Sequence, residues 1–103
     1  MENKELLLEA IDHYVLLSPT YRKVLKILVQ IAIDDTAIIG IKELTKLAGT
    51  SRISTYNALS LLEKEKFIEK LSIKGSKIGS FIIKPKKLQE VINHHSIKKN
   101  IIL

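Results

Sequence analysis

Polar and basic side chains gather between Thr50 and Lys64, in a stretch whose apolar residues recur at helical spacing. Arginine has the geometry to hold guanine or a phosphate with two hydrogen bonds, and asparagine has the geometry to bind an adenine edge. Hydroxyl groups reach phosphate oxygens or base edges. No acidic residue interrupts the stretch before Glu63. This chemistry suits a DNA groove, and the candidate contacts are Thr50, Ser51, Arg52, Ile53, Ser54, Tyr56, Asn57, Ser60 and Lys64.

The period of a helix divides this stretch into two faces. Thr55, Leu59 and Leu62 share one arc, which we expect to pack on the core. The opposite arc is the candidate DNA face, and it carries Ile53, Asn57, Ser60 and Lys64. An apolar side chain on that exposed arc suits a thymine methyl group.

Some of these residues have a purely structural alternative. Ser51 could serve only as a helix cap, Tyr56 could belong partly to the core, and Arg52 could lie on a solvated face. Because these residues lie together on one predicted helix with no acidic residue between Thr50 and Leu62, the pattern favours DNA binding.

A helix-turn-helix pattern at about residues 41–65 would position these side chains. Ile41, Leu44 and Leu47 predict a short amphipathic helix. Gly49 is the residue type best suited to end that helix in a left-handed conformation. Ser51 or Thr50 would then cap the longer helix. A turn of this kind between two helices is typical of proteins that place their second helix in the major groove.

Strand-forming residues follow at about 67–85 and predict a β-hairpin. The runs 67–74 and 81–84 would flank a basic tip at residues 75–80. Pairing Leu71 with Ile83, and Ile73 with Phe81, places apolar side chains on one face and is the register that buries more. An alternative uses Gly75 and Ser76 as a two-residue turn and pairs Ile73 with Ile78.

Further helices are predicted at residues 2–17, from Pro19 to about Asp34, and at 86–95, with a minimal strand at 37–40 beside the hairpin. Ser18 would cap the second helix, which has the pattern of a central core helix. The first helix has more apolar residues than one stripe requires, so it meets either a partner subunit or an all-round core. The apolar tail 101–103 would pack on that helix or on a second subunit. We therefore expect a homodimer through the terminal helices.

Cysteine content and charge distribution exclude some classes of function and favour others. The chain of 103 residues has a formal net charge of +6 and no cysteine, so disulfides and thiolate chemistry are excluded. Residues 1–17 contain four carboxylates and one lysine, whereas residues 67–85 contain four lysines and one glutamate. Positive charge weighted toward the second half favours a polyanionic partner.

Other chemistries find no support in the residue spacing. His94 and His95 are adjacent and would diverge on a helix, so we expect no metal site, no cofactor and no small-molecule ligand. No nucleophile, base and orienting group can be nominated, and the protein is not expected to be an enzyme. No apolar run approaches the roughly 18 residues of a membrane helix and the N-terminus is acidic, which together predict a cytoplasmic protein.

The stretch from about residue 20 to 85 resembles the winged helix-turn-helix regulators of bacteria and archaea. This broad group includes the multiple-antibiotic-resistance regulators and several plasmid and phage replication proteins. The pattern is carried by Leu44, Gly49, Ser51, Leu59, Leu62-Glu63 and Phe67-Ile68. Thr45 stands where alanine is usual, and Lys66 where glycine usually ends the reading helix, so Lys66 must adopt an unfavourable backbone angle or the exit must differ.

The resemblance implies that the hairpin tip touches the minor groove or the backbone, which adds Lys74, Ser76 and Lys77 as phosphate contacts; the alternative is a solvated turn. The expected fold is α+β, mainly α: a single winged helix-turn-helix domain, in α-α-β-α-α-β-β-α order, with extra terminal helices. Its expected function is sequence-specific binding of double-stranded DNA by a transcriptional regulator that occludes a promoter. The alternatives are a replication or segregation protein and a protein-protein interaction module.

Overall fold

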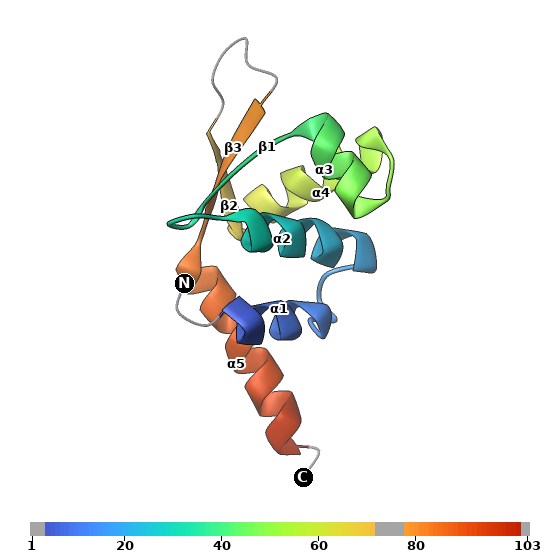
Figure 1. Cartoon of the computed structure of the whole chain (residues 1–103). Coiled ribbons are helices and arrows are strands. Elements are labelled where there is room, and N and C mark those ends of the chain that lie inside the picture. The colour runs from blue at the N-terminus through green and yellow to red at the C-terminus, as the bar shows by residue number, and fades with distance from the viewer. Residues whose placement is uncertain (1–3, 72–77, 102–103) are drawn as a thin grey trace.

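The computed structural model describes residues 4–71 and 78–101 of the chain. Within these residues, five helices and the strands of a three-stranded antiparallel sheet follow one another in the predicted order. The molecule is mainly helical and has a winged-helix-like α+β fold (Figure 1). The elements are α1 (Lys4–Asp12), α2 (Pro19–Ile31), β1 (Thr36–Gly40), α3 (Ile41–Ala48), α4 (Arg52–Lys64), β2 (Ile68–Leu71), β3 (Ile78–Ile83) and α5 (Pro85–Ile101).

Helix α2 lies between the α1–α5 pair and the α3–α4 pair (Figure 1). Its residues Val24, Leu25, Leu28 and Val29 are fully buried, which confirms the predicted central core helix. Pro19 occupies its first turn, where a missing N–H breaks no helical hydrogen bond. Ser18 stands at the N-cap position, but its side chain makes no capping hydrogen bond.

The first helix ends at Asp12, so the predicted extension to Leu17 is wrong. Two successive turns replace it, with hydrogen bonds from the Tyr14 N–H to the Ile11 carbonyl at 3.1 Å and from the Leu17 N–H to the Tyr14 carbonyl at 3.2 Å. These turns direct Tyr14 and Leu17 into the core, where both are buried. The intervening Val15 and Leu16 are 63% and 70% exposed.

Strand β3 is the centre of the sheet, with β1 and β2 on either side. The preferred hairpin register is wrong, because Leu71 pairs with Ser80 and Ile83 pairs with Ile68. These pairs have the offset of the alternative register, although Ile73 itself lies outside the described residues. The observed register places Ile68 and Ile83 together in the core, both almost completely buried.

Strand β3 begins at Ile78, inside the segment predicted as the tip. Gly79 pairs with Ile39 on β1, and the fully buried Phe81 ring packs over Gly79. A β-carbon at position 79 would lie 2.7 Å from the ring, closer than real contacts allow. Glycine at this position therefore allows the central strand to hold its aromatic side chain in the core.

The last helix runs from Pro85 to Ile101, so the predicted end near His95 is wrong. Of the tail at 101–103, residues 102 and 103 lie outside the described residues. Leu88 and Val91 are buried against the rest of the core, and the helix continues past α1 toward the C-terminus (Figure 1). His95 is buried beside α1, where its ring stacks on His13 at a centroid distance of 5.3 Å. Its Nε2 lies 3.5 Å from the Glu9 carboxylate.

Candidate nucleic-acid interface

The junction between α3 and α4 is fixed by two terminal residues. Gly49 ends α3 in the left-handed conformation, with φ of 63°, as predicted. Ser51 begins α4 as its N-cap, and its Oγ accepts a hydrogen bond of 3.0 Å from the Ser54 N–H. The same hydroxyl donates to the Ser54 Oγ at 2.9 Å. The turn is therefore set by local hydrogen bonds at the beginning of the candidate reading helix.

A chain of hydroxyl groups connects the two helices. The Thr45 hydroxyl donates to the Thr55 hydroxyl at 2.9 Å, and the Thr55 hydroxyl donates to the Ser51 carbonyl at 2.9 Å. Thr55 is completely buried, so these two bonds satisfy a hydroxyl that has no access to water. Thr45, a departure from the alanine of the family pattern, thus supplies a contact between helices that the sequence alone does not reveal.

The two faces of α4 follow the helical wheel. Thr55, Leu59 and Leu62 are buried. On the opposite arc all four residues are exposed: Ile53, Asn57, Ser60 and Lys64. An exposed fraction of 73% at Ile53 is high for an isoleucine, and it leaves this side chain available to an apolar surface.

The other candidate residues divide by exposure. Arg52 and Ser51 are exposed, whereas Thr50 and Ser54 are half-buried at the turn. Tyr56 is 45% exposed, so its ring belongs only partly to the core. Lys74, Ser76 and Lys77 lie outside the described residues.

The end of α4 explains the second departure from the family pattern. Lys66 has a φ of 67°, the left-handed conformation that glycine usually supplies. Its N–H bonds the Glu63 carbonyl at 3.1 Å, and the Phe67 N–H bonds the Leu62 carbonyl at 2.9 Å. This pair of bonds is a Schellman motif, in which the buried Phe67 follows the left-handed residue. The exit from the helix is thus retained, with a lysine in a strained position.

Charged side chains surround the beginning of α5. The Lys87 ammonium lies 5.3 Å from the Phe67 ring centroid and pairs with Glu90 at 3.1 Å. The hydrogen bond with Glu90 raises the pKa of Lys87.

Within residues 4–71 and 78–101, no group of histidine, aspartate and glutamate side chains has the arrangement of a metal site. In the same part of the chain, no helix is both long and apolar enough to cross a membrane.

The fold places the molecule among winged-helix-like proteins of mainly helical α+β class. Its sequence matches no protein-family model and no curated protein. Solved structures share the fold at low identity. The YusO protein from Bacillus subtilis superposes with a TM-score of 0.61 at 14% identity, over 94% of this chain and 67% of YusO.

Two further structures give similar values. RV1404 from Mycobacterium tuberculosis has a TM-score of 0.58 at 14% identity, over 95% of this chain and 69% of RV1404. A "possible transcriptional regulator" from Methanosarcina mazei Go1 has a TM-score of 0.55 at 11% identity, over 89% of this chain and 81% of that one. At these identities the likeness shows a common fold.

Proposed function

We propose that this protein binds double-stranded DNA sequence-specifically and acts as a transcriptional regulator. The observation that carries the proposal is the exposed arc of α4, a capped helix with polar, basic and apolar side chains and no carboxylate before Glu63. A helix with such a face fits the major groove, whose width admits one helix and whose base edges present distinct donors and acceptors.

The residues of this arc have separate roles in the proposal. Asn57 pairs with an adenine edge, and Ile53 packs against a thymine methyl group. Arg52 contacts guanine or clamps a phosphate, because its guanidinium forms two parallel hydrogen bonds to either. Tyr56, Ser60 and Lys64 contribute contacts to phosphates or base edges, and these position the helix in the groove.

The two ends of the interface bind the backbone. Thr50, Ser51 and Ser54 at the turn contact phosphate oxygens, which accept hydrogen bonds from hydroxyl and backbone N–H groups at the beginning of a helix. Lys74, Ser76 and Lys77 of the hairpin tip, predicted from the sequence, contact the backbone beside the minor groove.

Two copies associate through the terminal helices in this proposal and occupy a two-fold symmetric site. The exposed apolar residues Val15, Leu16 and Ile97, which belong to the α1–α2 connection and to α5, support this. The regulator role is supported by the description of the Methanosarcina mazei neighbour. Binding over a promoter would block transcription sterically, without a ligand.

Selection of bound sequences from a random duplex pool tests this function. The wild-type protein should enrich one motif with two-fold symmetry and a spacing of about one helical turn between half-sites. The Arg52→Ala/Asn57→Ala variant should enrich no motif, while the exposed control Lys86→Ala should enrich the wild-type motif. If the wild-type pool stays random, the sequence-specific function is refuted, and a general backbone binder or a protein-interaction module takes its place.

A further inference from the structure

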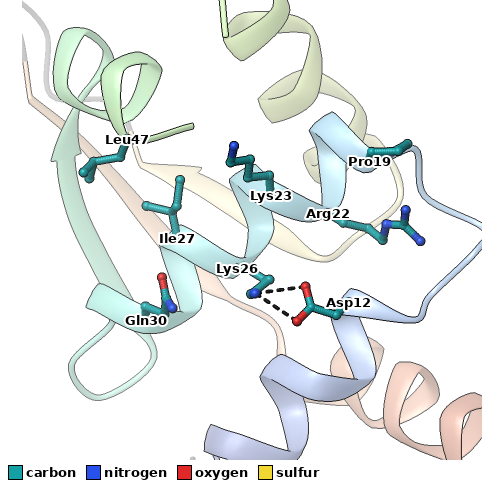
Figure 2. Close-up of a pocket in the computed structure, with 8 residues that line it drawn as sticks. All are labelled: Asp12, Pro19, Arg22, Lys23, Lys26, Ile27, Gln30 and Leu47. Carbon is teal, nitrogen blue, oxygen red and sulfur yellow. Dashed lines mark hydrogen bonds and ion pairs between the residues drawn. The ribbon is translucent and has the colours of Figure 1, made fainter. Parts of the chain in front are cut away.

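A groove beside the helix-turn-helix lies outside the predicted interface. It has a volume of about 430 Å³ and is formed by the end of α1, one face of α2, and α3. Its lining consists of Asp12, Pro19, Arg22, Lys23, Lys26, Ile27, Gln30 and Leu47 (Figure 2). Three cations and one carboxylate make this lining basic, which suits an anionic partner.

The three cations differ in what they already bind. Lys26 pairs with the Asp12 carboxylate at 2.9 Å, and Figure 2 shows the two side chains directed toward each other. The Arg22 guanidinium donates to the Tyr14 carbonyl at 3.5 Å, a weak hydrogen bond that ties it to the α1–α2 connection. Lys23 is exposed and, within the described part of the chain, has no ion-pair or hydrogen-bond partner.

The position of Lys23 relates it to the reading helix. A β-carbon built on Gly49 would lie 3.6 Å from the Lys23 Nζ, so this ammonium reaches the turn between α3 and α4. Lys23 points away from the Lys26–Asp12 pair (Figure 2). A lysine from α2 thus places positive charge beside Gly49, the residue that directly precedes Thr50 and Ser51 of the proposed DNA interface.

We propose that Lys23 binds a phosphate of the DNA backbone next to the segment read by α4, so that α2 extends the interface beyond the helix-turn-helix. The inference rests on the proposed function and names an additional contact for it. An extended polyanion fits better than a small apolar ligand, because five of the eight lining residues are charged or polar and three of these are cations. Leu47 and Pro19 also line the groove and are exposed.

Counterion release gives this contact a measurable signature. Each phosphate that a lysine neutralises contributes about 0.9 to the slope of log K against log[salt] on duplex DNA. A contact by Lys23 therefore predicts that Lys23→Gln lowers the slope by about one and weakens binding several-fold at low salt. Lys23→Arg keeps the charge and should restore the wild-type slope.

The test measures the affinity of the wild-type and variant chains for one fluorescent duplex at several salt concentrations from about 50 to about 200 mM, a span over which phosphate contacts weaken binding strongly. Lys86→Gln, which removes an equal charge from an exposed position on α5, controls for the overall field. The thermal unfolding midpoint of each variant is measured in parallel, because a merely structural role for Lys23 would change that midpoint and leave the slope unchanged.

The inference is supported if Lys23→Gln lowers the slope, Lys86→Gln leaves it unchanged and Lys23→Arg restores it. Equal effects of Lys23→Gln and Lys86→Gln would overturn it while leaving DNA binding intact. Absence of any binding by the wild-type protein would refute the proposed function and this contact together, so the two failures are distinguishable.

Discussion

Lys66 ends α4 in a backbone conformation that is energetically unfavourable for a lysine. A side chain with a β-carbon in the left-handed region costs about 1–2 kcal/mol, and Lys66 has a φ of 67°. The Schellman hydrogen bonds and the burial of Phe67 after it hold the residue there. The backbone at position 66 is therefore strained. Because Lys66 is not part of the proposed base-reading face, this strain can be tested by measuring stability alone.

Lys66→Gly should stabilise the protein by about 0.5–1 kcal/mol, because relief of the left-handed strain exceeds the added entropy of the unfolded chain. Chemical denaturation followed by circular dichroism would measure the change. The matched control is Glu65→Gly, one residue earlier at a φ of −83°, which should destabilise. If Lys66→Gly is destabilising as well, the strain assigned to Lys66 is wrong.

Asn57 and Lys77 should give opposite signatures on DNA. Asn57→Ala should relax the preference at particular bases, at a cost of about 1–3 kcal/mol on the preferred sequence, because a base-edge contact is lost. Lys77→Ala should weaken binding similarly on all sequences and flatten the salt dependence by about one unit. Titrations of preferred and scrambled duplexes at several salt concentrations would separate them. The reverse pattern would mean that helix and hairpin tip have exchanged roles.

Helices α3 and α4 are joined by the Thr45 and Thr55 hydroxyls. Thr55→Val should cost about 1–2 kcal/mol, because both hydrogen bonds of a buried hydroxyl are lost. Combining it with Thr45→Val should cost less than the two changes separately, with a coupling of about 0.5–1 kcal/mol. Equilibrium unfolding of all four proteins gives the coupling. Thr45→Val with the exposed Ser60→Ala is the control pair and should be additive; additivity of the Thr45 and Thr55 changes would refute the connection.

The helix-turn-helix could be predicted from the sequence because its determinants are local. Gly49 needs only its own backbone angle, Ser51 bonds a residue three positions later, and the wheel separates Leu59 from Asn57 without tertiary information. The structure agrees on both helices and on both faces of α4.

The hairpin register and the bounds of the terminal helices depend on contacts between residues far apart in the chain, which local residue patterns do not reveal. The hairpin considered alone favours the register with more apolar pairs. In the folded protein β1 also pairs with β3, which makes Gly79 part of the central strand of the sheet. The spacing of apolar residues likewise predicts a helix that continues through Tyr14. In the structure the chain turns after Asp12, and the Tyr14 ring is buried. The proximity of Lys23 to Gly49 spans 26 residues, so residue spacing within one helix does not reveal it.

The proposed dimer assigns a role to the exposed apolar residues near the terminal helices. Ile97→Asp should raise the dimer dissociation constant at least roughly tenfold, since a charge would enter a surface whose isoleucine contributes about 1.5–3 kcal/mol when buried. Analytical ultracentrifugation over a concentration series would measure this. Ile38→Asp, at a similarly exposed isoleucine on the sheet, is the control and should leave the dimer unchanged. A wild-type protein that stays monomeric would contradict the dimer.

Binding of duplex DNA by α4 is the central claim, and fluorescence anisotropy at low salt tests it most directly. The wild-type protein should bind a labelled duplex with an affinity that falls as salt rises, because phosphate contacts release counterions. Arg52→Ala/Asn57→Ala should bind at least tenfold more weakly, a loss that corresponds to about 1.4 kcal/mol or more, whereas Lys86→Ala should bind like the wild type. Negligible wild-type binding to both random and selected duplexes, or an affinity unchanged in the double variant, would contradict the account.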